Sequence, residues 1–287
     1  MSTNANIKSH VREAQATAET AAISPTMTAL ARVGYAAKGV VYLVIGILAA
    51  QLAIGQGGSA TDQRGALHTI YEQPFGKFLL TIVAIGLLLF TIWSFLQALL
   101  DTEHKGRDAK GIVSRIGYAI TGVSYGLLGW GALQLVMGTG SGGKSSTAST
   151  QTWTAKLLAQ PFGVPLVTLI GLIVIGLACF MFYRAYSANF ESHFSYAELR
   201  GEIRKWAMTA GRLGHAALGV DLLIVGIFLI VAALQHNPKD AKGLDGALQI
   251  LLHQPFGPLL LAIVAIGLAC YGVYSFVEAR YRRVGKK

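Results

Sequence analysis

Residues 73–100 read QPFGKFLLTIVAIGLLLFTIWSFLQALL, a turn signal followed by an almost unbroken apolar run. Proline in the first turn of a helix loses no hydrogen bond that it could have made, so Gln-Pro-Phe-Gly favours a helix start. A helix of about 20 apolar residues crosses the hydrocarbon core of a bilayer, and this run is longer. The stretch therefore predicts a membrane-spanning helix with a defined beginning.

Runs of this kind recur along the chain, and the Gln-Pro-Phe-Gly string recurs at 160–163 and 254–257. Of the 287 residues, 53% are hydrophobic and 13% are charged, whereas about 25% are charged in an ordinary soluble domain. This composition excludes a soluble globular enzyme as the default and predicts a polytopic membrane protein. We predict six spans, near residues 33–54, 76–99, 115–136, 162–186, 213–234 and 257–279.

An internal repeat links the six spans. Arg32, Arg115 and Arg212 are each followed by glycine two, seven and fourteen residues later, then by one Gln-Pro-Phe-Gly and one Ile-Gly-Leu string. The unit is therefore a helical hairpin repeated three times. Because every unit holds two spans, all three point the same way, and parallel repeats are related by an axis along the membrane normal. We predict an all-α integral membrane protein of six transmembrane helices, built as three tandem helical hairpins with pseudo-threefold symmetry about the membrane normal.

The predicted units account for most of the chain. A tail precedes them, short connections separate them, and a basic tail follows them. The segments are 1–30 (N-terminal tail), 31–101 (repeat 1), 114–187 (repeat 2), 210–281 (repeat 3) and 282–287 (basic tail).

This arrangement resembles a bacterial family catalogued as domain of unknown function 1206, whose members are similar in having three tandem two-helix units with Arg-x-Gly-Tyr and Gln-Pro-Phe-Gly strings. The resemblance covers roughly residues 31–281, and the third copy departs from it by having His215 where the others have tyrosine. It implies the six-helix architecture and no activity.

The basic residues indicate an orientation. Seventeen of the 24 Lys and Arg residues fall on the side of the two termini, six on the other side, and Lys38 lies within the first span. Because cytoplasmic loops are enriched in Lys and Arg, both termini should be cytoplasmic in a multi-pass protein of the bacterial inner (cell) membrane. The same rule explains the net charge of +10 without nucleic-acid binding. No cleavable signal peptide is evident, so the first span should serve as the targeting signal.

The extracytoplasmic loops are predicted to differ. Short amphipathic helices are expected at 66–71 and 247–252, in the headgroup region, whereas the Gly/Ser/Thr tract 138–152 should be flexible. Residues 138–145 spell a phosphate-binding loop, G-x-x-x-x-G-K-S. That loop works between a strand and a helix. Neither is expected here, so we predict no nucleotide.

Two sets of repeated residues have a structural and a functional interpretation. Glycines seven residues apart share one helix face and favour close helix packing over a pore lining. Arginines at the interface favour contacts with lipid headgroups over a ring for anions. The glycines are Gly39, Gly46, Gly122, Gly129, Gly219 and Gly226, and the arginines are Arg32, Arg115 and Arg212.

Asp221 is an anomaly, because a carboxylate deep in a span is costly without a partner. Lys38 lies at a similar depth in the first span, and Thr121 and Ser124 occupy the equivalent positions of the middle repeat. We therefore expect an intramembrane polar layer of these four residues. A structural Lys38–Asp221 ion pair is favoured, with an ion or proton site and an isolated protonated carboxyl as alternatives.

No catalytic signature, metal-ligand spacing or disulfide framework is evident, so no enzyme, metal or cofactor is predicted. His68 and His253 should be interfacial polar residues, and a haem or pigment ligand stays open. The preferred hypothesis is a small-ion or small-solute passage or its regulator, in contact with the lipid bilayer. An accessory subunit of a larger membrane complex, or a homo-oligomer, is the alternative. An intramembrane enzyme or pigment-binding protein comes third.

Overall fold

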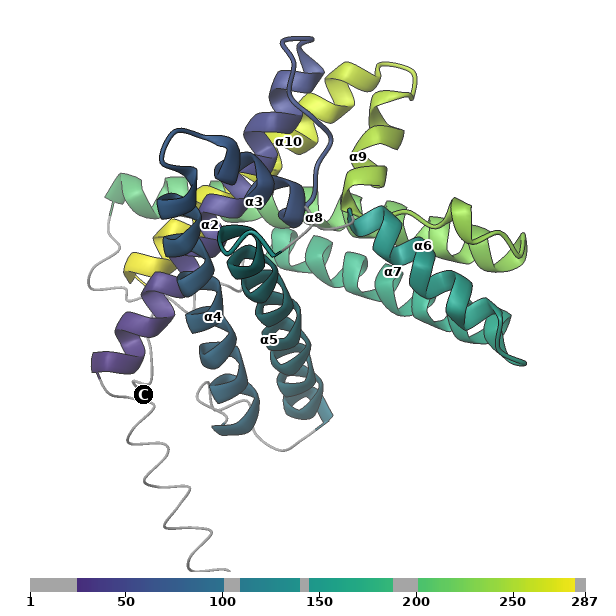
Figure 1. Ribbon diagram of the computed structural model, residues 1–287, viewed down its shortest axis with the longest axis horizontal. Helices are drawn as coiled ribbons and strands as arrows, with labels where there is room; N and C mark the ends of the chain where they lie inside the picture. The colour runs from purple at the N-terminus through teal and green to yellow at the C-terminus, as the bar shows by residue number, and fades with distance from the viewer. Residues whose placement is uncertain (1–24, 101–108, 140–144, 188–200, 282–287) are drawn as a thin grey trace, which may run out of the picture.

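The computed structural model describes residues 25–100, 109–139, 145–187 and 201–281, and all regular structure in them is helical (Figure 1). Six helices are long and apolar enough to cross a membrane. The predicted six-span, all-α fold is therefore confirmed. The predicted tails 1–24 and 282–287 lie outside the described residues. The long helices are α2 (Pro25–Ala53), α4 (Gly76–Leu100), α5 (Ala109–Val136), α7 (Gly163–Ser187), α8 (Gly201–Leu234) and α10 (Gly257–Tyr281).

Each Gln-Pro-Phe-Gly string is a tight turn between a short helix and a long one. Phe75 and Phe256 adopt positive φ angles of 61° and 60°, which redirects the chain. The residue after Phe75 must be glycine, because a Cβ atom at Gly76 would collide with the carbonyl oxygen of Tyr71. Gly257 lies in the same way against Leu252. The repeated string therefore specifies where α4 and α10 begin.

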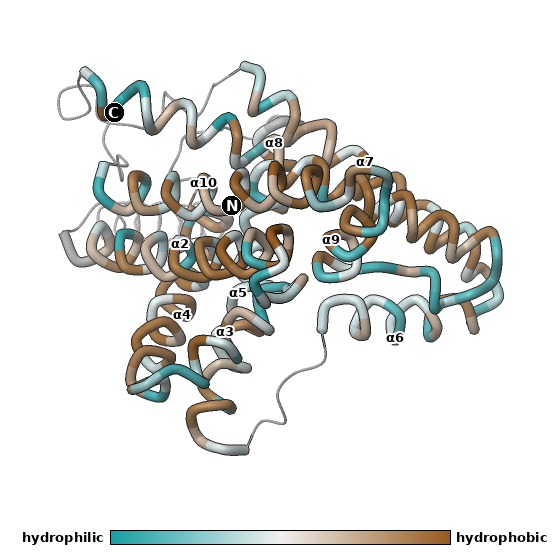
Figure 2. Tube along the Cα trace, turned by 90° about the horizontal axis from the view of Figure 1, so that it is seen from above, coloured by the Kyte–Doolittle hydropathy of each residue, from teal (hydrophilic) through white to brown (hydrophobic). Residues whose placement is uncertain are grey.

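Three short helices precede these turns: α3 (Gln63–Glu72), α6 (Ser146–Leu158) and α9 (Leu244–Leu252), with a 3₁₀ turn, η2 (Pro238–Asp240), before α9. The two short helices predicted from amphipathic patterns are confirmed as α3 and α9. The prediction of a flexible tract over 138–152 is wrong from Ser146 onward. Ser145 caps α6 by accepting a hydrogen bond from the Ala148 N–H, which compensates for poor intrinsic helix propensity. Figure 2 shows α6 as pale, in contrast to the brown apolar spans.

The long helices pack mainly between repeats. α4 packs on α5, α7 on α8, and α10 on α2, so the second helix of each hairpin lies against the first helix of the next one. This cyclic pattern is what a threefold arrangement of the repeats produces. Within hairpins, α2 packs on α4 and α8 on α10, but over their described lengths α5 and α7 make no comparable contact. The helices therefore form an open series, α5-α4-α2-α10-α8-α7, and in Figure 1 α5 and α7 diverge.

The six predicted packing glycines all lie at the contacts between repeats. Each meets the second helix of the preceding hairpin, where a Cβ atom would come within 3.3 Å of a neighbouring atom. The pairs are Gly39 with Gly272, Gly46 with Ala269, Gly122 with Phe95, Gly129 with Leu88, Gly219 with Phe182, and Gly226 with Ile175. We call the membrane face that carries α3, α6 and α9 the short-helix side and the opposite face the terminal side.

Candidate functional site

A cavity of about 740 Å³ lies between α5 on one side and α6, α7 and α8 on the other. Its wall includes Tyr42, Tyr125 and Leu222, which come ten residues after the repeated arginines and are therefore equivalent positions of the three repeats. Residues related by a threefold arrangement surround its axis. All three repeats therefore contribute to the wall of the cavity, which lies on the open side of the helix series, between α5 and α7.

The cavity wall is amphipathic. Tyr42 accepts a hydrogen bond of 3.2 Å from Gln63 Nε2, and the hydroxyl groups of Thr121 and Ser124 face the same space. Asp62, Arg64 and hydroxyl residues of α6 also line it, with Arg64 donating a hydrogen bond to Ser149, and the remaining side chains from α5, α6, α7 and α8 are apolar. A volume between about 300 and 1,000 Å³ with few polar groups is typical of small-molecule sites. The apolar lining includes Ile120, Leu127, Leu128, Leu157, Val167, Ile170, Leu222 and Leu229.

The predicted polar layer divides between this cavity and the protein interior. Thr121 and Ser124 line the cavity and donate hydrogen bonds to the carbonyl oxygens of Gly117 and Ile120. Asp221 precedes Leu222 of the cavity wall but is itself only 4% exposed. Within the described residues, its Oδ1 atom has no hydrogen-bond partner. The four residues therefore do not form one layer.

The proposed Lys38–Asp221 pair is wrong, because Lys38 faces α10. Its ammonium lies 3.6 Å from Oε2 of Glu278 and donates a 3.1 Å hydrogen bond to the hydroxyl of Tyr271. The side chains of Lys38 and Glu278 are only 7% and 5% exposed. α10 packs against both α2 and α8, so its own carboxylate lies nearer to Lys38. Sequence reasoning missed Glu278, although it is the only carboxylate of the sixth span.

Aromatic rings surround this ion pair. The Lys38 ammonium lies 4.7 Å from the ring centroid of Tyr271 and within 6 Å of the rings of Tyr35 and Phe90. His215, which replaces tyrosine in the third repeat, packs edge-on against Tyr271. Cation–π contacts of this kind compensate a desolvated ammonium. Lys38 also lies one helical turn from Tyr42, so the charge pair is next to the cavity on its terminal side.

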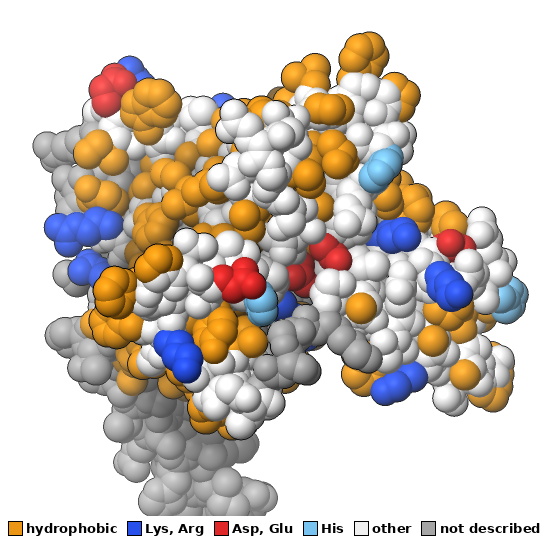
Figure 3. All heavy atoms as spheres, turned by 45° about the horizontal axis from the view of Figure 1, so that its top comes forward, with side chains coloured by type: hydrophobic (Ala, Val, Ile, Leu, Met, Phe, Trp, Pro, Cys, Tyr) orange, Lys and Arg blue, Asp and Glu red, His pale blue; other side chains and the backbone are white. Residues whose placement is uncertain are grey.

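Two carboxylates join the short helices on the short-helix side, and one of them, Asp62, also lines the cavity. Asp62 caps α3 through the Gly65 N–H and also accepts a hydrogen bond from the Ser146 N–H of α6. Asp245 of α9 accepts hydrogen bonds from the N–H and hydroxyl groups of Thr147. Figure 3 shows acidic side chains gathered near the middle of this face. The N-terminal ends of the three short helices are therefore fastened together.

Hydrogen bonding controls the ionisation of Asp245. Burial acts to raise the pKa of this carboxyl, but hydrogen bonds from Thr147 and Ser146 outweigh burial and hold the pKa below its ordinary value. The carboxylate is thus favoured as an anion at the N-terminus of α6.

The same hydrogen bonds bear on the phosphate-loop pattern of residues 138–145. A helix does follow this pattern, contrary to expectation. The N–H groups of Ser146 and Thr147 at its start, which a phosphate would need, already donate hydrogen bonds to Asp62 and Asp245. Residues 140–144 of that string lie outside the described residues.

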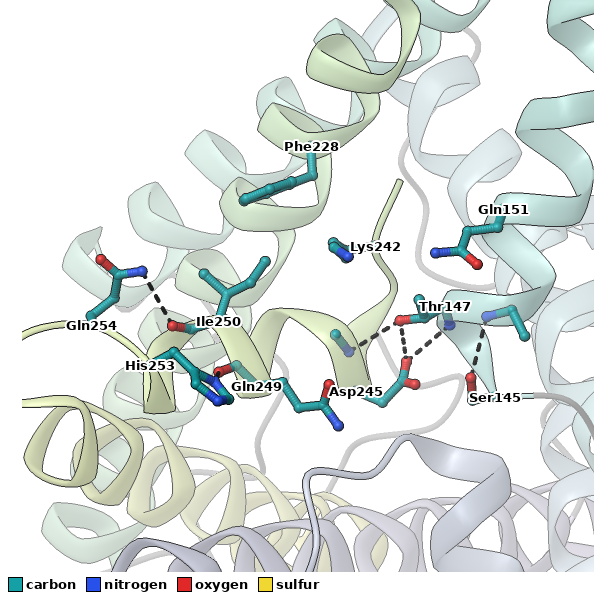
Figure 4. Close-up of a pocket in the computed structure, with 12 residues that line it drawn as sticks. Ser145, Thr147, Gln151, Phe228, Lys242, Asp245, Gln249, Ile250, His253 and Gln254 are labelled. Carbon is teal, nitrogen blue, oxygen red and sulfur yellow. Dashed lines mark hydrogen bonds between the residues drawn. The ribbon is translucent and has the colours of Figure 1, made fainter. Parts of the chain in front are cut away.

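A second pocket of about 490 Å³ lies between α6 and α9 (Figure 4). Its polar groups are largely committed to the protein itself. Asp245 binds Thr147, His253 contacts the Gln249 carbonyl, and Gln151 donates to the carbonyls of Lys239 and Ala241. Its lining comes from repeats 2 and 3 only, whereas all three repeats contribute to the larger central cavity, which is the stronger candidate site.

The repeated arginines do not act as one set. Arg115 donates hydrogen bonds to the carbonyl oxygens of Ala98 and Leu99, at the end of α4. Arg32 and Arg212 are exposed on the terminal side.

Within the described ranges, no group of three or more His, Cys, Asp or Glu residues is placed to hold a metal ion. His68, one of the two interfacial histidines of the sequence analysis, contacts the carboxylate of Glu72 on the same helix.

Comparison with known proteins agrees with the repeat pattern. The family described as Domain of Unknown Function (DUF1206) matches residues 33–101, 116–188 and 213–282, and the chain belongs to this family. The chain is 37% identical over 260 residues to the uncharacterized protein YxxB of Bacillus subtilis (strain 168), covering 91% of this chain and 93% of that protein. No solved structure matches.

Proposed function

We propose that this member of the DUF1206 family is a non-catalytic passage for a small solute, with the central cavity as its binding site. The observation that carries the proposal is the cavity wall to which the equivalent positions Tyr42, Tyr125 and Leu222 contribute. Membrane transporters built from repeats bind their substrates where the repeats meet. A volume of about 740 Å³ suits an organic solute better than a bare ion.

The polar groups around the cavity support this proposal. Asp62 and Gln63 close the short-helix side, and the Lys38–Glu278 pair lies beyond Tyr42 toward the terminal side. Ionisable groups within a membrane are expensive and commonly belong to a pathway.

The orientation belongs to the same proposal. From the distribution of Lys and Arg, we place both termini in the cytoplasm of a bacterial cell and the short-helix side outside the inner membrane. A reporter fused after Lys287 and a reporter inserted within 140–150 should indicate opposite compartments. Labelling of Lys144 from the cytoplasm would overturn this orientation.

Flux through proteoliposomes tests the passage. The permeabilities of propanediol, butanediol, acetamide and butyramide, four small uncharged solutes with a polar and an apolar part, would be followed by light scattering. Ser124→Trp fills the cavity, and Val123→Trp, at the adjacent exposed position outside the cavity lining, is the matched control. We expect the protein to raise the permeability of at least one solute, and Ser124→Trp alone to abolish the increase. Permeabilities equal to those of protein-free liposomes for all four would contradict the proposal.

An accessory role is the second candidate, and one observation favours it. At Gly117 of α5 and Gly176 of α7, a Cβ atom would have no described atom within 4 Å, so a helix of another protein has room to pack there. The absence of flux together with an unchanged fold would favour this role.

A further inference from the structure

We propose that the solute enters the cavity from the bilayer, through a gate between α5 and α7 that closes in the manner of the outer hairpins. The solute class is an uncharged amphipathic molecule dissolved in the membrane. The proposal rests on the proposed function, because it names the route and the solute of the same cavity.

The outer hairpins show the closed form of the gate. In repeat 1, a Cβ atom at Gly34 would lie 2.7 Å from the Cβ atom of Phe90, so α2 and α4 are in tight contact. In repeat 3, Gly214 lies equally close to Tyr271 of α10. Each contact has a glycine on the first helix and an aromatic residue on the second.

A second glycine contact reinforces each closed hairpin. Gly86 of α4 packs on Ala37 of α2, and Gly267 of α10 packs on Ala217 of α8. These glycines belong to the Ile-Gly-Leu strings, and the alanines lie five residues after Arg32 and Arg212. Small residues on both helices allow their backbones to approach closely.

The middle hairpin has the same parts, but they lie apart. Gly117 is equivalent to Gly34, and Gly176 is equivalent to Gly86, yet no described atom lies within 4 Å of where their Cβ atoms would be. Phe180, equivalent to Phe90, is 51% exposed, whereas Phe90 is 4% exposed. The middle hairpin therefore has the residues that form the closed contact in repeat 1, but in the structure these residues do not touch.

Two differences explain why this hairpin rests open. Ile120 occupies the position where the outer hairpins have alanine, and its larger side chain opposes the approach of Gly176. The middle repeat also has three more residues between its Gln-Pro-Phe-Gly and Ile-Gly-Leu strings, which places Gly176 almost one helical turn farther from the start of its helix than Gly86 and Gly267 are. Both features weaken the closed contact without removing the glycines and Phe180 that form it.

The borders of the opening select the solute. No charged residue occurs from Ile116 to Val136 on α5 or from Gly163 to Tyr183 on α7. Most exposed side chains along both borders are apolar, including Ile120, Leu127, Ile173 and Phe180, and the exposed Ser124 lines the cavity. A charged solute passing between them would lose its hydration without a partner. Deeper in the cavity, Gln63 and hydroxyl groups can bind a polar part of the solute, so the molecule that fits is amphipathic.

Thiol labelling tests the route. In a background with Cys179→Ala and Cys270→Ala, Ser124→Cys places a thiol in the cavity, and Val123→Cys places a matched thiol at the adjacent exposed position, which does not line the cavity. Proteoliposomes would be treated with uncharged N-ethylmaleimide or with a charged methanethiosulfonate. We expect N-ethylmaleimide to label both variants and the charged reagent to label neither within the same time.

A crosslink tests the gate. Gly117→Cys with Phe180→Cys should form a disulfide under mild oxidation, and the two single-cysteine variants, which cannot form it within one chain, are the controls. Once oxidised, the 117/180 pair should reduce N-ethylmaleimide labelling of Ser124→Cys at least tenfold and leave Val123→Cys unchanged. Reduction should restore labelling.

The outcomes separate the two proposals. Labelling of Ser124→Cys by the charged reagent would overturn bilayer entry and leave the passage intact. Failure of every reagent to label Ser124→Cys, while Val123→Cys reacts, would contradict the cavity and hence the proposed function. A 117/180 disulfide between two chains, instead of within one, would overturn the gate in favour of a face covered by a second copy.

Discussion

The outer hairpins and the middle hairpin carry the same pattern and differ in packing. Phe90 and Trp93 of repeat 1 are 4% and 2% exposed, whereas their counterparts Phe180 and Tyr183 are 51% and 57% exposed. The glycines and aromatic residues therefore allow the two helices of a hairpin to pack together. Ile120 and the three additional residues of the middle repeat oppose that packing. This difference creates both the cavity and its opening.

A second contrast separates the same regions. The contact between α2 and α10 contains the buried Lys38–Glu278 pair. At the equivalent positions, the middle repeat has Thr121 and Ser187, so the ion pair has no charged equivalent there. The outer repeats are thus joined by a contact that depends on buried charge, and the middle hairpin has none.

The largest expected effect comes from filling the closed contact. In Gly34→Leu, the new side chain would collide with the backbone of α4 at Phe90. The loss of folding free energy should therefore exceed the about 1–3 kcal/mol that ordinary overpacking costs. We expect little folded protein in detergent. Gly117→Leu, the same change at the equivalent open position, should retain most of the folded yield by size-exclusion chromatography. Similar losses at both positions would refute the difference between the hairpins.

Breaking the buried ion pair should have the next largest effect. Lys38→Met removes the ammonium beside the buried Glu278 carboxylate, and breaking a buried ion pair by removing one partner costs about 3–5 kcal/mol. Adding Glu278→Gln removes the buried negative charge and introduces glutamine, the residue found at the equivalent position of repeat 1, Gln97. This second change should recover part of the lost thermal stability. If the double variant is as unstable as the sum of the single variants, the two residues do not act as a pair.

A smaller effect is expected at Asp245. Because its folded-state pKa is lowered, ionised Asp245 contributes stability above its unfolded pKa of about 3.9, and this stability is lost as the pH falls through the folded-state value. Asp245→Asn should lower Tm at pH 7 by roughly 4–8 °C, as expected for about 2 kcal/mol.

The difference in Tm between the wild type and Asp245→Asn should narrow as the pH falls below about 4. Glu72→Gln is the control, since that carboxylate is exposed and should matter little at any pH. A constant Asp245→Asn effect from pH 7 to pH 3 would show that hydrogen bonds to the ionised form are unimportant.

Much of the fold could be predicted from the sequence. Hydropathy and the Gln-Pro-Phe-Gly strings located the spans, because length and turn chemistry act locally. The glycine spacing predicted a packing face, since residues seven apart share one side of a helix. It could not predict that Gly122 meets Phe95 of the preceding hairpin, because the partner of a face depends on how whole helices are arranged.

The candidate site was less accessible to sequence reasoning. Lys38 was paired with Asp221 by depth alone, and depth does not say which way a side chain points. Helix α6 was missed because its Ser/Thr-rich sequence has weak helix propensity, and its stabilising contacts with Asp62 and Asp245 come from segments more than 80 residues away in sequence.

The spacing of α5 and α7 in a lipid bilayer tests the central claim most directly. Spin labels at Ile116→Cys and Leu177→Cys report the middle hairpin, and labels at Leu213→Cys and Ile266→Cys report an outer one; all four positions are exposed. For the outer pair, we predict one short, narrow distance distribution by pulsed electron resonance. For the middle pair, we predict a longer distance, with a short component that grows when the 117/180 disulfide is formed. A single short, narrow distribution for the middle pair before crosslinking would contradict the account.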